Sequence, residues 1–230
     1  MLFAEEKYRE AAERFRHSLQ SYVSHYNSKT GPENIEAVAS GQLMSYILMK
    51  SEKYDEASRA LSKELDRTKE VYGSESIQAA DTMTNLATVL FYKNDFDESR
   101  AYYQRALAIY ERLVAETSLP SNAEPLRLIY TCLGDINYIK GKDEDALNYY
   151  IKVEEMFFKS EKPEDLLSYI PAMKNLAMTH WRLDNADLAE PLFSRILDIL
   201  KGHKKYGEGH SQTRVISEYL QRLNYSMAFD

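Results

Sequence analysis

Apolar residues recur three and four positions apart along most of the chain. Leu86, Val89 and Leu90 follow this spacing in one segment, and Leu107 and Tyr110 follow it in the next. Successive residues of a strand point to opposite faces, whereas an α-helix brings residues three and four apart onto one face. The spacing therefore predicts amphipathic helices rather than strands.

Short polar stretches divide these helical segments. Glycine and proline are scarce, with 8 and 6 residues, and they concentrate in the stretches between predicted helix pairs. These stretches are 28–32, 73–76, 117–125, 160–163 and 202–211. Tighter polar turns within the pairs lie at 51–53, 93–95, 140–142 and 184–185. Each unit is therefore predicted to consist of a helix A, a turn and a helix B.

One short motif recurs at the start of each predicted helix B. Its five copies align without gaps, and their last residues lie 46, 42, 47 and 43 positions apart. The copies are Lys7–Ala11, Lys53–Ala57, Asp95–Ser99, Lys142–Ala146 and Asn185–Ala189. Self-similarity at a nearly fixed period is typical of solenoids, in which each repeat buries the apolar face of its neighbour.

Two further positions repeat in register with this motif. A bulky residue follows four positions after each copy, at Phe15, Leu61, Tyr103, Tyr150 and Phe193. A small residue lies twelve positions before the last residue of four of the copies, at Ser45, Ala87, Gly134 and Ala177, directly after Met44, Leu86, Leu133 and Leu176. A small side chain allows helix A to approach helix B closely.

These motifs resemble the tetratricopeptide repeat, and the long period resembles the subclass found in kinesin light chains. The best match comprises residues 71–75, 85–87, 96–99 and 105–111, with a weaker copy of the loop at 206–210. The resemblance implies an all-α fold, a right-handed superhelical solenoid of antiparallel helix pairs. We expect one such domain over residues 1–230: a partial repeat at 1–27, repeats at about 33–72, 75–116, 124–159 and 165–202, and a terminal helix at 211–225. The missing first helix A predicts a fragment or an incomplete first repeat.

The resemblance also implies a binding surface, because helix A of each tetratricopeptide repeat faces the concave side. In register, the predicted peptide-binding residues are Tyr46, Met49, Lys50, Asp81, Thr84, Asn85, Thr88, Tyr92, Thr131, Asp135, Tyr138, Lys174, Asn175, Met178 and Arg182.

Two asparagines on this predicted surface have a specific expected role. Asn85 and Asn175 precede Leu-Ala, and in similar proteins this Asn bonds the backbone of a bound peptide. An amide suits that task because it donates and accepts hydrogen bonds. The alternative interpretation is an ordinary polar surface residue.

The same predicted surface carries three cations, namely Lys50, Lys174 and Arg182. Each could pair with a carboxylate of a ligand through charge-assisted hydrogen bonds. The alternative is a solvated cation, since the Lys-x-x-x-Asn pairing of chaperone-binding relatives is absent in this register.

The composition argues against several other functions. The formal charge of −7 disfavours nucleic acid, whose phosphates are bound by Lys and Arg. A single cysteine, Cys132, excludes an internal disulfide framework and fits a reducing compartment, so cytoplasm is expected, with cytoskeletal association left open. No apolar run is long enough to span a membrane.

No constellation predicts catalysis or a cofactor. The five histidines are scattered, without HExxH or another metal-ligand spacing, and phosphate-loop and nucleophile motifs are absent. Cys132 lies on a predicted packed helix, where a thiol behaves as a small hydrophobe.

Three hypotheses remain at this point. The first is a non-catalytic scaffold or adaptor that binds peptide segments of partner proteins. The second is a structural subunit of a larger, cytoskeletal or ciliary assembly, which would use the convex face and self-associate through its end repeats. The third, an enzyme, has the least support.

Overall fold

The computed structural model describes residues 48–49, 51–116, 124–158, 165–203 and 206–227. These residues form α-helices, turns and loops, and none of them is in a β-strand. The predicted partial repeat at 1–27, Tyr46 and Lys50 lie outside the described residues. The all-α class, with helices packed against their neighbours in sequence, is confirmed.

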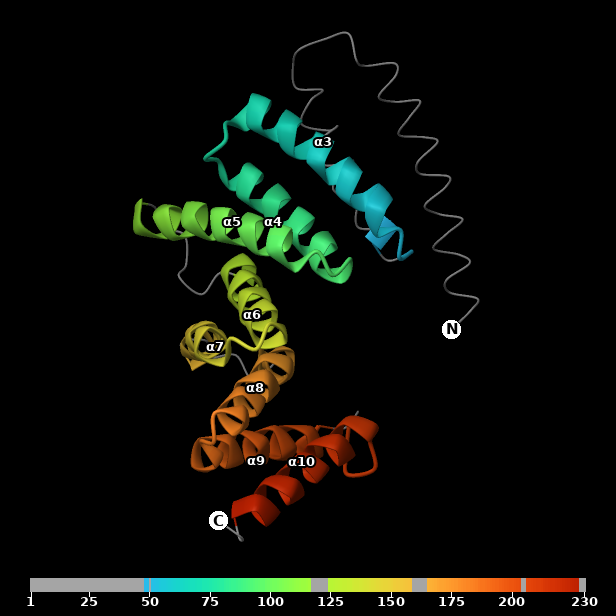
Figure 1. Ribbon diagram of the computed structural model, residues 1–230, viewed down its shortest axis with the longest axis vertical. Coiled ribbons are helices and arrows are strands. Elements are labelled where there is room, and N and C mark those ends of the chain that lie inside the picture. The colour runs from blue at the N-terminus through green and yellow to red at the C-terminus, as the bar shows by residue number, and fades with distance from the viewer. Residues whose placement is uncertain (1–47, 50, 117–123, 159–164, 204–205, 228–230) are drawn as a thin grey trace. The chain divides into compact units, whose positions relative to one another are not determined.

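The chain divides into two compact units, Met1–Leu119 and Pro120–Asp230. In the first unit, α3 (Tyr54–Tyr72) packs against α4 (Ile77–Tyr92), which packs against α5 (Phe96–Glu116) (Figure 1). Ser76 caps α4, because its hydroxyl accepts a hydrogen bond from the amide of Ala79 at 3.1 Å. This unit contains the described part of the best-matching repeat.

The second unit contains the remaining described helices. They are α6 (Glu124–Ile139), α7 (Asp143–Phe158), α8 (Asp165–Arg182), α9 (Ala186–Gly202) and α10 (Ser211–Met227). Each packs against the next, and α6 also contacts α8, so the first helices of consecutive repeats are neighbours here. Figure 1 shows this succession from yellow to red.

The same turn closes each described helix pair. One residue adopts a left-handed conformation, with φ between 58° and 69°, and the next amide bonds the carbonyl five residues earlier at 2.9 Å. The left-handed residues are Glu52, Asn94, Gly141 and Asp184. This is the Schellman type of helix end, which satisfies carbonyls that the helix leaves unpaired. The four predicted tight turns are therefore confirmed in detail.

The predicted close approach of helix A to helix B at the small position is present at Gly134. Tyr103, Tyr150 and Phe193 are fully buried, as are Ala87, Gly134 and Ala177. A Cβ added to Gly134 would lie 2.6 Å from Cε1 of Tyr150. In the preceding repeat the Ser99 hydroxyl donates to the Ala87 carbonyl oxygen at 2.7 Å, which joins the two helices at the same level.

Candidate functional site

Most of the polar residues of α4 that reach solvent form one stripe along the helix. Gln78, Asp81, Asn85, Thr88 and Tyr92 are spaced three and four apart, and all are half-buried or exposed. We call Asp81, Asn85, Thr88 and Tyr92 the α4 stripe. The residues between them pack against α3 and α5, so the stripe is the part of α4 that an incoming ligand reaches.

Thr84 is the predicted α4 site residue that does not belong to the stripe. Its side chain is 4% exposed, and its hydroxyl donates to the carbonyl oxygen of Ala80 at 2.8 Å. A side chain in this state offers almost no surface to a peptide. We therefore leave Thr84 out of the site.

Two members of the α4 stripe are held by tyrosines of α5. The hydroxyl of Tyr110 donates to the carboxylate of Asp81, and the hydroxyls of Thr88 and Tyr103 are hydrogen-bonded at 2.8 Å. Burial raises the pKa of Asp81, and the hydrogen bond from Tyr110 opposes this shift. Asn85 lies between the two held residues and is exposed.

In the second unit, a carboxylate joins three helices. Asp135 on α6 accepts a hydrogen bond from the Tyr150 hydroxyl of α7 at 2.6 Å and another from the Asn175 amide of α8 at 2.7 Å. Burial raises the pKa of Asp135, while both hydrogen bonds and the charge of Lys174 oppose the rise. One N–H of Asn175 is therefore committed to Asp135, and its carbonyl oxygen and second N–H are the groups that remain for a ligand.

These contacts follow the repeat. Thr88 and Asp135 each lie two residues after the leucine that precedes the small residue of helix A. Their partners, Tyr103 and Tyr150, each lie four residues after the last residue of the helix B motif. The two hydrogen bonds therefore occupy equivalent places in successive repeats. In the last full repeat the same positions hold Met178 and Phe193. A buried tyrosine hydroxyl needs a partner. Where helix B carries phenylalanine, helix A carries an apolar residue.

The side chain of Arg182 makes three contacts within the second unit. Its guanidinium lies over the ring of Tyr138, 4.3 Å from the ring centroid, and pairs with Asp143 at 3.1 Å. It also donates to the carbonyl oxygen of Tyr138 at 3.2 Å. These contacts connect the end of α8 to the end of α6 and the start of α7.

The structure adds exposed residues that the sequence pattern missed. Leu128 and Ile139 on α6 are 42% and 53% exposed, and they continue the line of Thr131, Asp135 and Tyr138. With Lys174, Asn175, Met178 and Arg182 of α8, these residues form what we call the α6/α8 face. Ile139 was detectable from the sequence, because it is equivalent to Tyr92 and Arg182 in the repeat register.

The described residues offer no arrangement for a metal. Among them, no group of three or more His, Cys, Asp or Glu side chains could hold an ion. Cys132 is buried on α6, in keeping with a packing role. No helix in the described ranges combines the length and the apolar character that a membrane crossing requires.

Comparison with known proteins agrees with this architecture. Residues 36–112 match the family model of the tetratricopeptide repeat. No curated protein matches the sequence significantly. The solved structures with a similar fold include BtubC (BKLC) from P. vanneervenii, with a TM-score of 0.71 and 18% identity over 87% of this chain and 77% of that one.

Two further structures are similar. One is a Podospora anserina protein with nearly identical TPR-like repeats, described as a kinesin light chain, with a TM-score of 0.68 and 15% identity over 83% and 87% of the two chains. The other is YrrB, described as a TPR protein with an unusual peptide-binding site, with a TM-score of 0.55 and 19% identity over 84% and 82%. At these identities the likeness concerns the fold. It confirms the resemblance to tetratricopeptide repeat solenoids of the kinesin light chain type.

Proposed function

We propose that the chain is a non-catalytic interaction scaffold that binds an extended peptide segment of a partner protein along the exposed stripe of helix A. The observation that carries the proposal is the α4 stripe, in which an exposed amide, Asn85, lies between polar side chains held in place by α5. Preorganised polar groups lose little freedom on binding. The peptide-binding site named for YrrB, a protein of similar fold, adds support.

Asn85 is the central residue of this proposal. Its amide would donate to one carbonyl oxygen and accept from one N–H of the extended ligand backbone. Such contacts recognise a main chain rather than a particular side chain. The side chains of Asp81 and Thr88, on either side of Asn85, would restrict the orientation of the bound peptide on the helix.

The α6/α8 face is a second contact region in the proposal. Leu128, Ile139 and Met178 expose apolar surface there, and Lys174 adds a cation. Apolar anchors beside a charge are typical of surfaces that bind peptides. Asn175 would contribute its carbonyl oxygen and its second N–H, because the first N–H is bonded to Asp135.

The test is capture of partners from a cell lysate by wild type, Asn85→Ala and Gln104→Ala, compared by quantitative mass spectrometry. Gln104 is exposed on α5, so its truncation is a matched change outside the stripe. Loss of hydrogen bonds to the ligand backbone costs about 1–3 kcal/mol, so Asn85→Ala is expected to weaken partner binding about tenfold. Gln104→Ala should bind as wild type does.

Two readouts make the result decisive. Circular dichroism should give the same helical content and melting temperature for all three proteins, because both residues are exposed. A captured partner should also bind through a short synthetic segment of its own sequence. Equal capture by Asn85→Ala and wild type would contradict the proposal and favour the structural-subunit hypothesis, with interfaces outside the helix A stripe.

A further inference from the structure

A small hollow lies at the junction of the first two repeats. Met49, Glu52, Tyr54 and Tyr92 line it. The rings of Tyr54 and Tyr92 are nearly parallel, with 9° between their planes and 6.1 Å between their centroids, and Tyr92 is 54% exposed. The hollow therefore presents aromatic surface and one carboxylate to solvent.

The carboxylate of Glu52 is not neutralised by a described cation. Lys93 pairs with Asp55 at 3.1 Å and Asp95 at 2.9 Å, and Lys53 pairs with Glu56 at 3.8 Å. Glu52 is exposed and forms no ion pair with any described residue. Among the described residues, the charge of Glu52 is therefore left to be neutralised by a ligand.

The repeat register identifies an equivalent place in the second unit. The positions of Met49, Glu52, Tyr54 and Tyr92 correspond there to Tyr138, Gly141, Asp143 and Arg182. At that junction the guanidinium of Arg182 rests on the Tyr138 ring and pairs with Asp143. Its Nη2 also lies 3.9 Å from the position of a Cβ on Gly141. The equivalent place is therefore filled by a guanidinium from the chain itself.

We propose that the hollow lined by Met49, Glu52, Tyr54 and Tyr92 binds the guanidinium of an arginine in the partner peptide. The proposal rests on the proposed function, and it adds the class of side chain that this part of the surface selects. The first junction has the aromatic surface and the carboxylate. It has Tyr92 at the position that Arg182 occupies in the equivalent junction of the second unit, so it lacks that guanidinium. An external arginine would supply the missing cation.

Arginine fits this place better than lysine. A guanidinium is planar, stacks on aromatic rings and donates two parallel hydrogen bonds to one carboxylate. An ammonium group is compact and strongly hydrated, so it gains less from the ring faces. The thioether of Met49 adds a polarisable wall beside the rings.

The test is an NMR titration of the full chain with a short blocked peptide that contains one arginine between glycines. The matched probe carries citrulline, which has the same shape without the charge. The arginine peptide should shift the amides around Glu52, Tyr54 and Tyr92, and the citrulline peptide should bind at least about fivefold more weakly.

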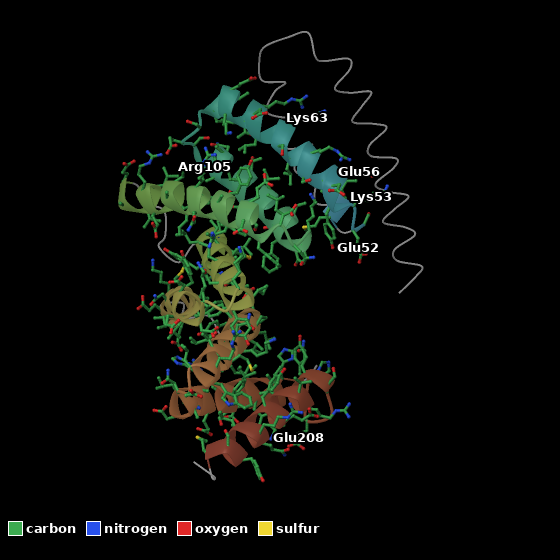
Figure 2. All side chains as sticks on the ribbon, viewed as in Figure 1. Glu52, Lys53, Glu56, Lys63, Arg105 and Glu208 are labelled. Carbon is green, nitrogen blue, oxygen red and sulfur yellow. The ribbon has the colours of Figure 1, made fainter. Side chains whose placement is uncertain are left out.

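The variants Glu52→Gln and Glu56→Gln remove the same charge from neighbouring places at the start of α3 (Figure 2). Glu52→Gln should weaken binding of the arginine peptide about fivefold, while Glu56→Gln should change it less than about twofold. Tyr92→Arg should also abolish binding, because the new side chain would fill the hollow as Arg182 fills its equivalent.

Three results would overturn the proposal: equal binding of the citrulline peptide, equal losses in the two glutamate variants, or shifts confined to other surfaces. None of these would affect the capture test with Asn85→Ala. If binding of a partner depends on Asn85 but is unchanged by Glu52→Gln, the proposed function is supported and the proposed arginine site is contradicted.

Discussion

Gly134→Ala is expected to lower the free energy of unfolding by about 2 kcal/mol, within the range for overpacked cores. The new Cβ would lie 2.6 Å from Cε1 and 2.9 Å from Cδ1 of the Tyr150 ring. That ring cannot easily move, because it is buried and its hydroxyl is bonded to Asp135 at 2.6 Å. Urea denaturation followed by circular dichroism would measure the change.

The sign of this effect is the informative part. In a helix without steric conflict, Gly→Ala stabilises by up to about 1 kcal/mol, since glycine loses more backbone entropy on folding. Gly202, the last residue of α9, has no atom within 4 Å of an added Cβ, so Gly202→Ala is the matched control. It should be neutral or stabilising. Wild-type stability in Gly134→Ala would mean that helices α6 and α7 are less closely packed than described.

Glu64→Gln is expected to stabilise the protein at alkaline pH by about 2–3 kcal/mol and to have little effect in acid. Glu64 lies on α3 with 2% of its surface exposed, and one carboxylate oxygen, Oε1, is buried without a hydrogen-bond partner among the residues that the structure describes. Burial raises the pKa of Glu64 to about 7, although the charge of Arg67 opposes the shift. Glutamine has nearly the same shape and carries no charge to bury.

The pH dependence follows from the direction of that shift. Between the ordinary glutamate pKa and about 7, the folded protein holds a proton that the unfolded chain releases. The stability contributed by this proton is complete below the unfolded pKa and is lost as the pH rises through about 7. Urea melts from pH 4 to 9 should therefore show wild type and Glu64→Gln diverging with increasing pH.

Glu70→Gln provides the control for this measurement. Glu70 is exposed on the same helix, and its replacement changes the net charge equally. Its effect on stability should be small and nearly independent of pH, as for most exposed charges. A constant difference between wild type and Glu64→Gln across the pH range would show that Glu64 is not buried in its charged form.

The helices and their turns could be predicted from local sequence. A helical period, a polar turn and a motif repeated at a nearly fixed spacing are properties of adjacent residues, and they specify each helix pair. The close approach of α6 and α7 at Gly134 was also accessible, because Gly134 occupies the small position of the repeated pattern. Even so, the left-handed conformation of Glu52 was not evident, since glutamate rarely adopts it.

The candidate site was only partly predictable. Their positions in the repeat predicted that Asn85 and Tyr92 lie on an exposed stripe, and both are exposed. The same reasoning predicted that Thr84 lies there, but Thr84 is buried. A single residue, a rotation of about 100° around the helix, separates Asn85, which faces solvent, from Thr84, which is buried, and periodicity alone does not decide between them. Arg182 shows the same limit, because its pairing with Asp143 depends on how α8 packs against α7.

The sequence by itself therefore determined the helical class, the repeat and the short turns, because these depend on residues close together in the chain. Only the tertiary structure decided which polar groups are already paired. Asp135 binds Tyr150 and Asn175 across 15 and 40 positions of sequence. It also decided that the guanidinium of Arg182 fills one repeat junction, because its contacts with Tyr138 and Asp143 join side chains that lie on different helices.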